Sequence, residues 1–458
     1  MTAAAAHPLL AHSTPDSIVA LRHGEAITVA RFLADVARVA AMLPAGGHVL
    51  NTCRDRYRFA VGLAATLVSG RISLLPSTLT HEVSGHLREF APDFYCLTDG
   101  PQDAFGAACV SYPEDDSASA PAIAIPRIPP IPHIPADRTV AWLFTSGSTG
   151  MPVPHRKSWG ALVRNVRAEG EILGLRDGRQ HAIVGTVPAQ HMYGFESTVM
   201  VALQSGAAFS SGRPLFPADI CAEIAVVPRP RILVTTPFHL RTLLDAGIAI
   251  PALDLILSAT APLSGNLVRE AEERCAAPLL EIYGSTETGQ IASRRPAESP
   301  EWQLFPGIQL SERDGRFWAA GGHVEQPVPM NDALELTSNG RFLLHGRSAD
   351  MINIAGKRSS LAYLNHQLCA VPGVADGAFF IPDEEMPDGV TRLAAIVVAP
   401  ELNTASLLRA LRERVEPAFL PRRVLFVPAL PRNTTGKLPA EALRALLAAH
   451  AAHAAGKR

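Results

Sequence analysis

The sequence predicts an α/β protein, with a large N-terminal domain of several subdomains built on parallel sheets and a small α+β C-terminal domain. Helical patterns alternate with short apolar segments through most of the chain, as expected where helices join parallel strands. After about Glu301 the apolar segments shorten and acquire glycine turns. The chain has 458 residues, more than one hydrophobic core usually supports. We therefore expect two domains, at residues 1–349 and 350–458.

The predicted elements follow from hydrophobic periodicity. In the N-terminal part we expect helices at residues 31–43, 57–69, 159–173, 237–245 and 267–275, and strands at 48–50, 71–75, 140–144, 182–187, 232–235, 255–258 and 279–282. Dense proline at residues 121–135 excludes a central strand or a helix interior, so an extended surface connection is expected there. In the C-terminal part we expect a strand at 394–398 and helices at 404–415 and 440–455.

Composition narrows the class of function. Hydrophobic residues make up 47% of the chain and charged residues 18%, which is typical of a well-packed enzyme. A net charge of −2 gives no general attraction to nucleic acid or to an anionic membrane, so neither is an expected partner. Six cysteines without a C-x-x-C pair indicate neither a zinc site nor a disulfide framework. Without a signal peptide or a membrane-spanning apolar run, a cytoplasmic location is expected.

The segment at residues 144–150, Phe-Thr-Ser-Gly-Ser-Thr-Gly, has the composition of a phosphate-binding loop. Its glycines let the backbone approach a ligand, and its hydroxyl and backbone N–H groups can donate to phosphate oxygens. It is not a Walker A loop, because Met151 and Pro152 stand where a lysine and a serine or threonine should follow the last glycine. Taken alone, the segment fits a surface turn equally well.

Two further segments lie at predicted strand ends, where open α/β sheets bind ligands. Residues 283–289, Tyr-Gly-Ser-Thr-Glu-Thr-Gly, carry one carboxylate, Glu287, among hydroxyls and glycines. A carboxylate that faces a phosphate loop is a suitable ligand for Mg²⁺ bridging phosphates. Residues 258–263, Ser-Ala-Thr-Ala-Pro-Leu, are small enough to line a flat ring.

Two motifs nearer the C-terminus complete the pattern. One runs from Asp332 through Gly340 to Gly346-Arg347 and Asp350. The other, at residues 431–437, is the turn-rich segment Pro-Arg-Asn-Thr-Thr-Gly-Lys. By themselves, Asp332 could be an ordinary turn aspartate and Lys437 a solvated loop lysine.

In this order the motifs T-S-G-S-T-G, Y-G-S-T-E-T-G, D-x₇-G-x₅-G-R-x-x-D and P-R-x-x-x-G-K resemble those of the adenylate-forming superfamily. This superfamily comprises acyl-CoA synthetases, aryl-acid ligases and adenylation domains of peptide synthetases. The resemblance extends from about residue 32 to residue 443. It implies an AMP-forming acid–thiol ligase that uses ATP and Mg²⁺ to make an acyl- or aryl-adenylate and releases pyrophosphate. The acyl group would then pass to CoA or to the phosphopantetheine of an acyl carrier protein.

The resemblance also implies roles for individual residues. The phosphates of ATP would be held by Thr145, Ser146, Gly147, Ser148, Thr149 and Gly150. Adenine would lie against Ala259, Thr260, Ala261, Tyr283 and Gly284, and the ribose against Asp332 with Arg347 in support. Catalysis would involve Thr286 at the α-phosphate, Glu287 as the Mg²⁺ ligand and Lys437 at the carboxylate and α-phosphate, with Asp350 as the hinge of a mobile C-terminal domain. His191 would lie at the acyl pocket, although a core histidine is the alternative; the pocket walls are expected at residues 191–196, 235–238 and 258–260.

The chain departs from this family after the phosphate loop. The usual run is Gly-x-Pro-Lys-Gly, whereas Val153 here takes the place of the lysine. We expect Lys157, or else Arg156, to compensate from a displaced position; otherwise pyrophosphate is held by one fewer cation. The run Pro-x-Pro-His-x-Lys resembles bacterial ligases of aryl-polyene and fatty-acid-like pathways. It therefore suggests a hydroxyaryl or fatty acid and a carrier-protein acceptor.

Three alternatives stay open at this level. The pair Lys357-Arg358 would either meet a phosphate of the acceptor or be solvated. A catalytically degenerate nucleotide-binding scaffold is motivated by the missing loop lysine, although Glu287, Asp332 and Lys437 are all retained. A simple ATPase or kinase is disfavoured, because the Walker lysine and a second metal-binding aspartate motif are absent.

Overall fold

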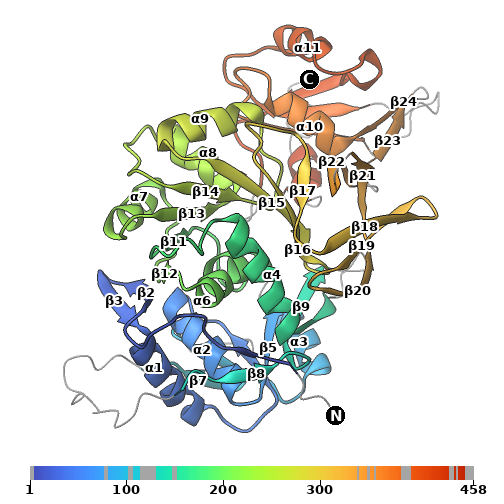
Figure 1. The fold of residues 1–458 in the computed structure, drawn as a ribbon. Coiled ribbons are helices and arrows are strands. Elements are labelled where there is room, and N and C mark those ends of the chain that lie inside the picture. Colours follow the sequence, from blue (N-terminus) through green and yellow to red (C-terminus); the bar gives the residue numbers. More distant parts are fainter. Residues whose placement is uncertain are drawn as a thin grey trace.

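The computed structural model describes residues 5–76, 81–101, 107–113, 130–146, 152–337, 340–347, 351–354, 357–382, 393–432, 438–439 and 442–448. Two large sheets with helices between and around them form the body of the molecule, and a separate α+β unit lies at one end (Figure 1). The predicted fold class, α/β with parallel sheets followed by a smaller α+β part, is confirmed.

The first sheet has six strands in the order β10-β9-β5-β4-β6-β7. Its strands are β4 (His48–Asn51), β5 (Ile72–Pro76), β6 (Tyr95–Thr98), β7 (Cys109–Ser111), β9 (Thr139–Ser146) and β10 (Pro152–Ser158), and its helices are α1 (Val29–Met42), α2 (Arg56–Val68) and α3 (His81–Phe90). The side chains of Thr28 and Asp55 accept backbone N–H groups at the starts of α1 and α2. All neighbours pair in parallel except β9 and β10, which form an antiparallel pair on either side of the predicted phosphate loop.

The strand β10 is absent from the sequence prediction. Its two prolines, Pro152 and Pro154, argue against a strand, because proline cannot donate to a ladder. The structure accommodates them because β10 is the edge strand of the sheet.

The second sheet has eleven strands in the order β21-β22-β17-β16-β15-β14-β13-β11-β12-β2-β3. Its parallel centre is β2 (Ile18–Arg22), β12 (Ala208–Ser210), β11 (Ala182–Gly185), β13 (Arg231–Thr235), β14 (Leu255–Ser258) and β15 (Leu279–Ser285). Antiparallel strands flank it: β3 (Glu25–Thr28), β16 (Gly289–Arg294), β17 (Trp302–Leu304), β21 (Asp332–Leu336) and β22 (Arg341–Arg347). The strands predicted at 182–187, 232–235, 255–258 and 279–282 all lie in the parallel centre.

Helices cover both faces of the second sheet. The helix α4 (Trp159–Ile172), the π-helix η1 (Phe195–Met200) and α6 (Val201–Ser205) lie between the two sheets, and their buried side chains share one core with α1 and α2 (Figure 1). The helices α7 (Pro217–Val226), α8 (Pro237–Asp245) and α9 (Gly265–Cys275) pack on the other face and form a second core. Both large sheets therefore have the buried parallel strands that their continuous apolar runs predict.

Small strands complete the N-terminal part. Strands β18 (Ile308–Arg313), β19 (Arg316–Gly321) and β20 (Val324–Pro329) form an antiparallel sheet. Of the proline-rich segment 121–135, residues 121–129 lie outside the described residues. The end of that segment, β8 (His133–Pro135), pairs with β1 (Ala6–Pro8), in keeping with the predicted extended backbone.

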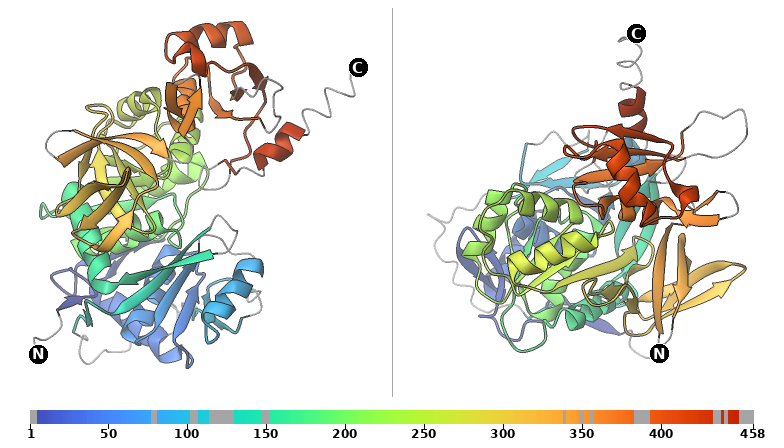
Figure 2. Two further views of the ribbon diagram at one scale, coloured as in Figure 1. Left: turned by 90° about the vertical axis from the view of Figure 1, so that its right-hand side faces the viewer. Right: turned by 90° about the horizontal axis from the view of Figure 1, so that it is seen from above.

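The C-terminal unit has its own hydrophobic core and stands at one end of the molecule (Figure 2). Its elements are β23 (Met351–Ile354), β24 (Lys357–Ser360), α10 (Leu361–Cys369), β25 (Asp376–Phe380), β26 (Ala394–Val398), α11 (Thr404–Arg412), the 3₁₀ turn Pro417–Phe419 and β27 (Arg423–Phe426). Residues 442–448 of the last predicted helix are helical. Asp350 lies outside the described residues, so the domain boundary there stays a prediction.

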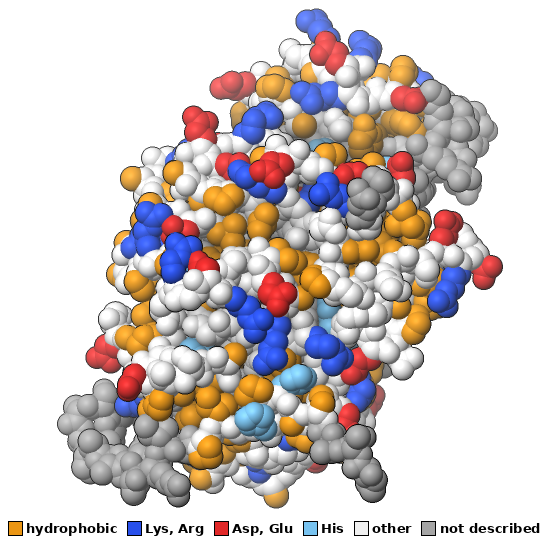
Figure 3. Space-filling model, viewed as in Figure 1, with side chains coloured by type: hydrophobic (Ala, Val, Ile, Leu, Met, Phe, Trp, Pro, Cys, Tyr) orange, Lys and Arg blue, Asp and Glu red, His pale blue; other side chains and the backbone are white. Residues whose placement is uncertain are grey.

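The distribution of charge on the surface and the length of the helices agree with the low net charge and the absence of long apolar runs in the sequence. On the face of Figure 1, basic and acidic side chains are interspersed (Figure 3). Within the described part of the chain, no helix is long and apolar enough to cross a bilayer.

Candidate active site

The residues predicted to bind adenine and ribose are in direct contact. The hydroxyl of Tyr283, in β15, donates to Oδ2 of Asp332, in β21, at 2.6 Å. The Tyr283 ring is held from behind by Trp302 and Phe342, with ring centroids 5.5 and 5.7 Å away. Asp332 is also the cross-strand partner of Arg347 in β22, and the support of Asp332 by Arg347 stays a prediction. The side chain of Arg347 lies outside the described residues.

The small-residue loop after β14 lies next to Tyr283 along the sheet. Thr260 has a φ of +82°, a left-handed conformation that is costly for a threonine and that clusters at ligand sites. Ala259 is buried and Ala261 half-buried. Glu281 accepts the backbone N–H of Leu263 at 3.3 Å and pairs with Arg294 at 2.5 Å. Burial raises the pKa of Glu281, while Arg294 lowers it. Glu281 was not predicted as a site residue, because its partners Leu263 and Arg294 lie in other segments of the chain.

The motif at 283–289 forms a tight hairpin between β15 and β16. A Cβ on Gly284 would lie 2.2 Å from the carbonyl oxygen of Gly289, so only glycine fits there. Thr288 closes the turn, because its Oγ1 accepts the backbone N–H of Ser285 at 3.1 Å. Thr286 and Glu287 then stand at the tip, with the Glu287 side chain 37% exposed.

His155 connects this tip to the phosphate loop. Its Nε2 lies 2.9 Å from Oγ1 of Thr145 and 3.6 Å from Oε1 of Glu287. Burial lowers the pKa of His155, Glu287 raises it and Lys157 lowers it. The β9–β10 hairpin thus brings Thr145 and Glu287, 142 residues apart in the sequence, to the same imidazole. His155 belongs to the run Pro-x-Pro-His-x-Lys, but no role was predicted for it from the sequence. The pairing of β9 with β10 places it near Thr145.

Lys157 lies below the hairpin tip, where it is 7% exposed. Its Nζ donates to the backbone carbonyl of Glu287 at 3.4 Å. Burial lowers the pKa of Lys157, while the carboxylates of Glu196, Glu287 and Glu325 raise it. The role of Lys157 in holding pyrophosphate stays a prediction. In the structure, Lys157 contacts the backbone of Glu287, the residue that is predicted to bind Mg²⁺.

Two buried carboxyl groups lie behind Lys157. Glu196 accepts from Nδ2 of Asn165 at 2.5 Å, and burial raises its pKa to about 7, against the lowering effect of Lys157. Glu169 is fully buried in α4, and burial raises its pKa to about 8. Glu196 lies in the π-helix η1, a type of helix that frequently marks functional sites.

Several predicted residues fall where the structure says nothing of their side chains. Gly147, Ser148, Thr149, Gly150, Asp350 and Lys437 lie outside the described residues, and Ser146 is described in its backbone only. The strand β9 nevertheless leads into the phosphate loop, as predicted. The lysine motif is anchored just before Lys437, because Arg432 donates to both carboxylate oxygens of Asp376 at 2.7 Å.

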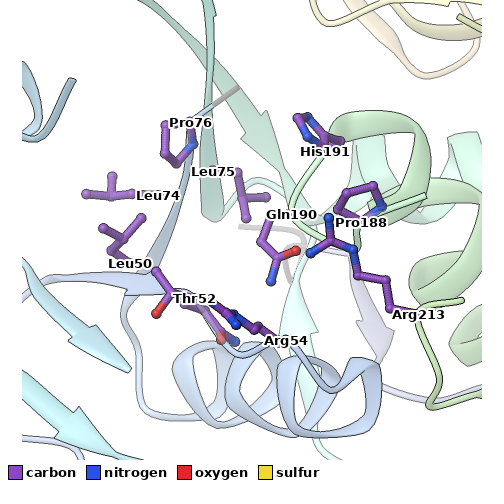
Figure 4. Close-up of a pocket in the computed structure, with 11 residues that line it drawn as sticks. Leu50, Thr52, Arg54, Leu74, Leu75, Pro76, Pro188, Gln190, His191 and Arg213 are labelled. Atoms are coloured by element: carbon purple, nitrogen blue, oxygen red, sulfur yellow. The ribbon is translucent and has the colours of Figure 1, made fainter. Parts of the chain in front are cut away.

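A pocket of about 200 Å³ opens beside the phosphate loop, at the carboxyl ends of β4 and β5 (Figure 4). It is lined by Leu50, Asn51, Thr52, Arg54, Leu74, Leu75, Pro76, Pro188, Gln190, His191 and Arg213. Pro76 pairs with Phe144 in β9, one residue before Thr145. His191 lines this pocket, where it is half-buried at the start of α5 (Met192–Gly194); its place at an acyl pocket stays a prediction. The predicted walls at 235–238 and 258–260 do not line this pocket.

Comparison with known proteins finds family models and relatives that point to AMP-binding enzymes and CoA ligases, and solved structures that share the fold. A family model described as AMP-binding enzyme matches residues 10–312, and one described as AMP-binding enzyme C-terminal domain matches residues 364–437. A 4-coumarate–CoA ligase of Rhodobacter capsulatus is 31% identical over 297 residues, which cover 64% of this chain and 73% of the relative. A 4-chlorobenzoate–CoA ligase of an Arthrobacter species is 27% identical over 381 residues, covering 74% and 70%. The crystal structure of ATP-bound MatB from Rhodopseudomonas palustris shares the fold, with a TM-score of 0.78 at 20% identity over 95% of this chain and 96% of that one.

Proposed function

This chain belongs to the AMP-binding enzyme family, and we propose that it activates an aryl acid with ATP as the aryl-adenylate and transfers the aryl group to the thiol of CoA. The predicted reaction class, an AMP-forming acid–thiol ligase, is confirmed by homologues that are aryl- and acyl-CoA ligases. The observation that carries the proposal is the 2.6 Å hydrogen bond between Tyr283 and Asp332, because it joins the groups predicted to bind adenine and ribose.

The nucleotide would lie across the ends of β14, β15 and β21. Adenine would stack on Tyr283 beside Ala259, Thr260 and Ala261, and the ribose hydroxyls would donate to Asp332. The left-handed conformation of Thr260 supports a ligand at this loop, because strained backbone of this kind clusters at ligand sites. The phosphates would extend toward Thr145 and residues 146–150, with Thr286 at the α-phosphate.

Glu287 fits an Mg²⁺ ion that is shared with phosphates. Its carboxylate is the exposed acid at the hairpin tip, and the described residues contain no group of three His, Cys, Asp or Glu that would hold a metal by themselves. An ion there would complete its coordination with phosphate oxygens and water, as Mg²⁺ usually does. When bound, Mg²⁺ would offset the phosphate charge during attack. His155 would position Glu287, and Lys157 would hold its backbone.

Adenylation requires a carboxylate to approach an anionic phosphate. The carboxylate oxygen would form a bond to the α-phosphorus, and the bond to pyrophosphate would break. Lys437 would neutralise the developing charge, held in place by the Arg432–Asp376 pair. Rotation of the domain beginning near Asp350 would then replace Lys437 with the face that serves thioester formation.

The substrate class rests on the relatives. Their names specify coumarate, chlorobenzoate and hydroxybenzoate, all acids with an aromatic ring. We therefore favour an aryl acid over a fatty acid, with His191 at the acyl pocket. CoA is the acceptor in their names, and a phosphopantetheine carrier protein is the second acceptor to test, with Lys357-Arg358 as its predicted contact.

The test is ATP–pyrophosphate exchange with a panel of aryl and fatty acids. We expect pyrophosphate exchange that depends on Mg²⁺ and on an aryl acid. On addition of CoA or of a phosphopantetheinylated carrier protein, we expect a thioester to form and AMP to be released. Exchange in the absence of any acid would contradict the assignment. Tight ATP binding without exchange would instead favour the nucleotide-binding scaffold.

A further inference from the structure

The pocket beside the phosphate loop contains two cationic side chains without a counter-ion among the residues that the structure describes. Arg54 follows β4, and Arg213 lies on the far side, after β12 (Figure 4). Neither guanidinium has an ion pair or a hydrogen bond to a described carboxylate. Both arginines line the same pocket, and partial burial, followed by the charge of Arg54, lowers the pKa of Arg213.

The acids near Arg54 are committed elsewhere. The two carboxylate oxygens of Asp99 accept the backbone N–H groups of Arg54 and Asp55, at 2.8 and 3.0 Å. Asp55 pairs with Arg22 at 3.0 Å and accepts a backbone N–H at the start of α2. Two cations that line one pocket, with no anionic side chain among its described lining residues, form an unfavourable arrangement that a bound anion would relieve.

The rest of the lining suits the body of an aryl acid. Leucines and prolines from β4, β5 and the 188–191 loop form the walls, which is the mixture of apolar surface and few polar groups that ligand pockets show. Gln190 fixes this loop, because its Nε2 donates to the backbone carbonyl of Cys53. His191, which is predicted to lie at the acyl site, lines the same pocket, whereas the walls predicted at 235–238 and 258–260 do not; the arginines therefore border the predicted acyl site on the His191 side.

We propose that Arg54 and Arg213 bind a second anionic group at the far end of the acid that is activated, so that the preferred substrates are aryl dicarboxylates. This inference rests on the proposed function and adds a substrate class to it. A volume of about 200 Å³ equals roughly seven water molecules, enough for a carboxylate with a few carbons. The nucleotide part of CoA is much larger, which is why the acid is favoured over an acceptor phosphate.

The test compares two acids of equal shape, 4-carboxycinnamate and 4-carbamoylcinnamate, which differ in the charge of the para group. Pyrophosphate exchange would be measured with the wild type, Arg54→Gln, Arg213→Gln and Arg213→Lys, with Arg409→Gln in α11 as the control for loss of an exposed arginine. We expect the wild type to prefer the dicarboxylate. Each glutamine variant should lower kcat/KM for the dicarboxylate ~10- to 100-fold, because the loss of a hydrogen bond to a charged group has an effect of about this size. The kcat/KM for the carboxamide should change less than about twofold. Arg213→Lys should recover part of the loss.

Four results would overturn this inference. One is an equal loss of kcat/KM for both acids in the glutamine variants, which would indicate a structural role of the arginines. The second is no loss of kcat/KM for either acid. The third is an increase in KM for CoA with the acids unaffected, which assigns the arginines to the acceptor. Exchange with 4-coumarate but no preference for the dicarboxylate would sink this inference alone. No exchange with any acid would sink the proposed function as well.

Discussion

At the residue scale, the candidate site depends on a few polar contacts between distant parts of the chain. Tyr283 and Asp332 illustrate this, because they belong to different motifs and to different strands, β15 and β21. The bond between them lets a phenol hydroxyl orient the carboxylate that would accept the ribose hydroxyls. It is therefore the simplest contact by which to test the nucleotide site.

Tyr283→Phe should raise KM for ATP ~10-fold, because a hydrogen bond to a charged group is lost while the ring remains. Steady-state kinetics of pyrophosphate exchange would measure this. Tyr57→Phe is the matched control, since Tyr57 donates to Asp35 at 2.7 Å in the contact between α1 and α2. It should lower the melting temperature and leave KM for ATP unchanged. An equal effect of both variants on KM would contradict the assignment of Tyr283.

A second residue-scale prediction concerns Glu169. Its native pKa is about 8, above the ordinary value of 4.5, so the folded protein holds a proton that the unfolded chain releases between these values. The free energy of unfolding should therefore fall as pH rises from about 5 to 8. Glu169→Gln should show a smaller fall over this range in urea titrations. Glu273→Gln, at an exposed position in α9, should keep the wild-type slope; a flattened slope in this control would contradict the role of Glu169.

At the element scale, the β9–β10 hairpin decides what surrounds the phosphate loop. Alternation along β10 puts Val153, His155 and Lys157 on one face, and His155 and Lys157 both reach Glu287. Val153 lies on the same face nearer the loop and is 43% exposed. The missing family lysine therefore leaves an accessible position, while Lys157 is committed to the interior.

Val153→Lys should restore a cation beside the phosphate loop. Its exposure predicts a modest gain, so we expect KM for ATP to fall ~2- to 5-fold in the exchange assay. The gain should shrink at high salt, because an exposed charge pair is screened. Val153→Gln supplies a side chain of similar length without charge and should show no gain. If it improves KM as much as the lysine does, the cation is not the cause.

At the scale of the whole molecule, the described part of the C-terminal unit packs against the body through α10 and β24, which both contact β22. Its core is separate, and the bridging hydrogen bonds include Asn266 to the carbonyl of Ala370 at 3.4 Å and Ser360 to the carbonyl of His345. A separate hydrophobic core is what the domain rotation of the two half-reactions would require.

Lys437→Ala should lower the rate of adenylation ~10²-fold or more, because the charge that offsets the transition state is removed. Thioester formation from a preformed adenylate should proceed at nearly the wild-type rate. Single-turnover measurements of each half-reaction would separate the two effects. An equal loss in both would argue against two conformations of the C-terminal domain.

The α/β class and most strands of the parallel centre could be predicted from the sequence alone, as could the motifs that are expected to bind the nucleotide. Hydrophobic periodicity and glycine-rich turns are local properties, so they can be recognised within a short window. The tertiary structure decided that Pro152–Ser158 is an edge strand, that His155 lies between Thr145 and Glu287, and that Arg54 and Arg213 share one pocket. The edge strand was missed because its two prolines argue against a strand, although it pairs with its neighbour β9. The approach of His155 to Glu287 and the pocket shared by Arg54 and Arg213 depend on packing between segments more than a hundred residues apart. Such contacts form only when the chain has folded, because no local pattern specifies which distant side chain will complete a buried polar group.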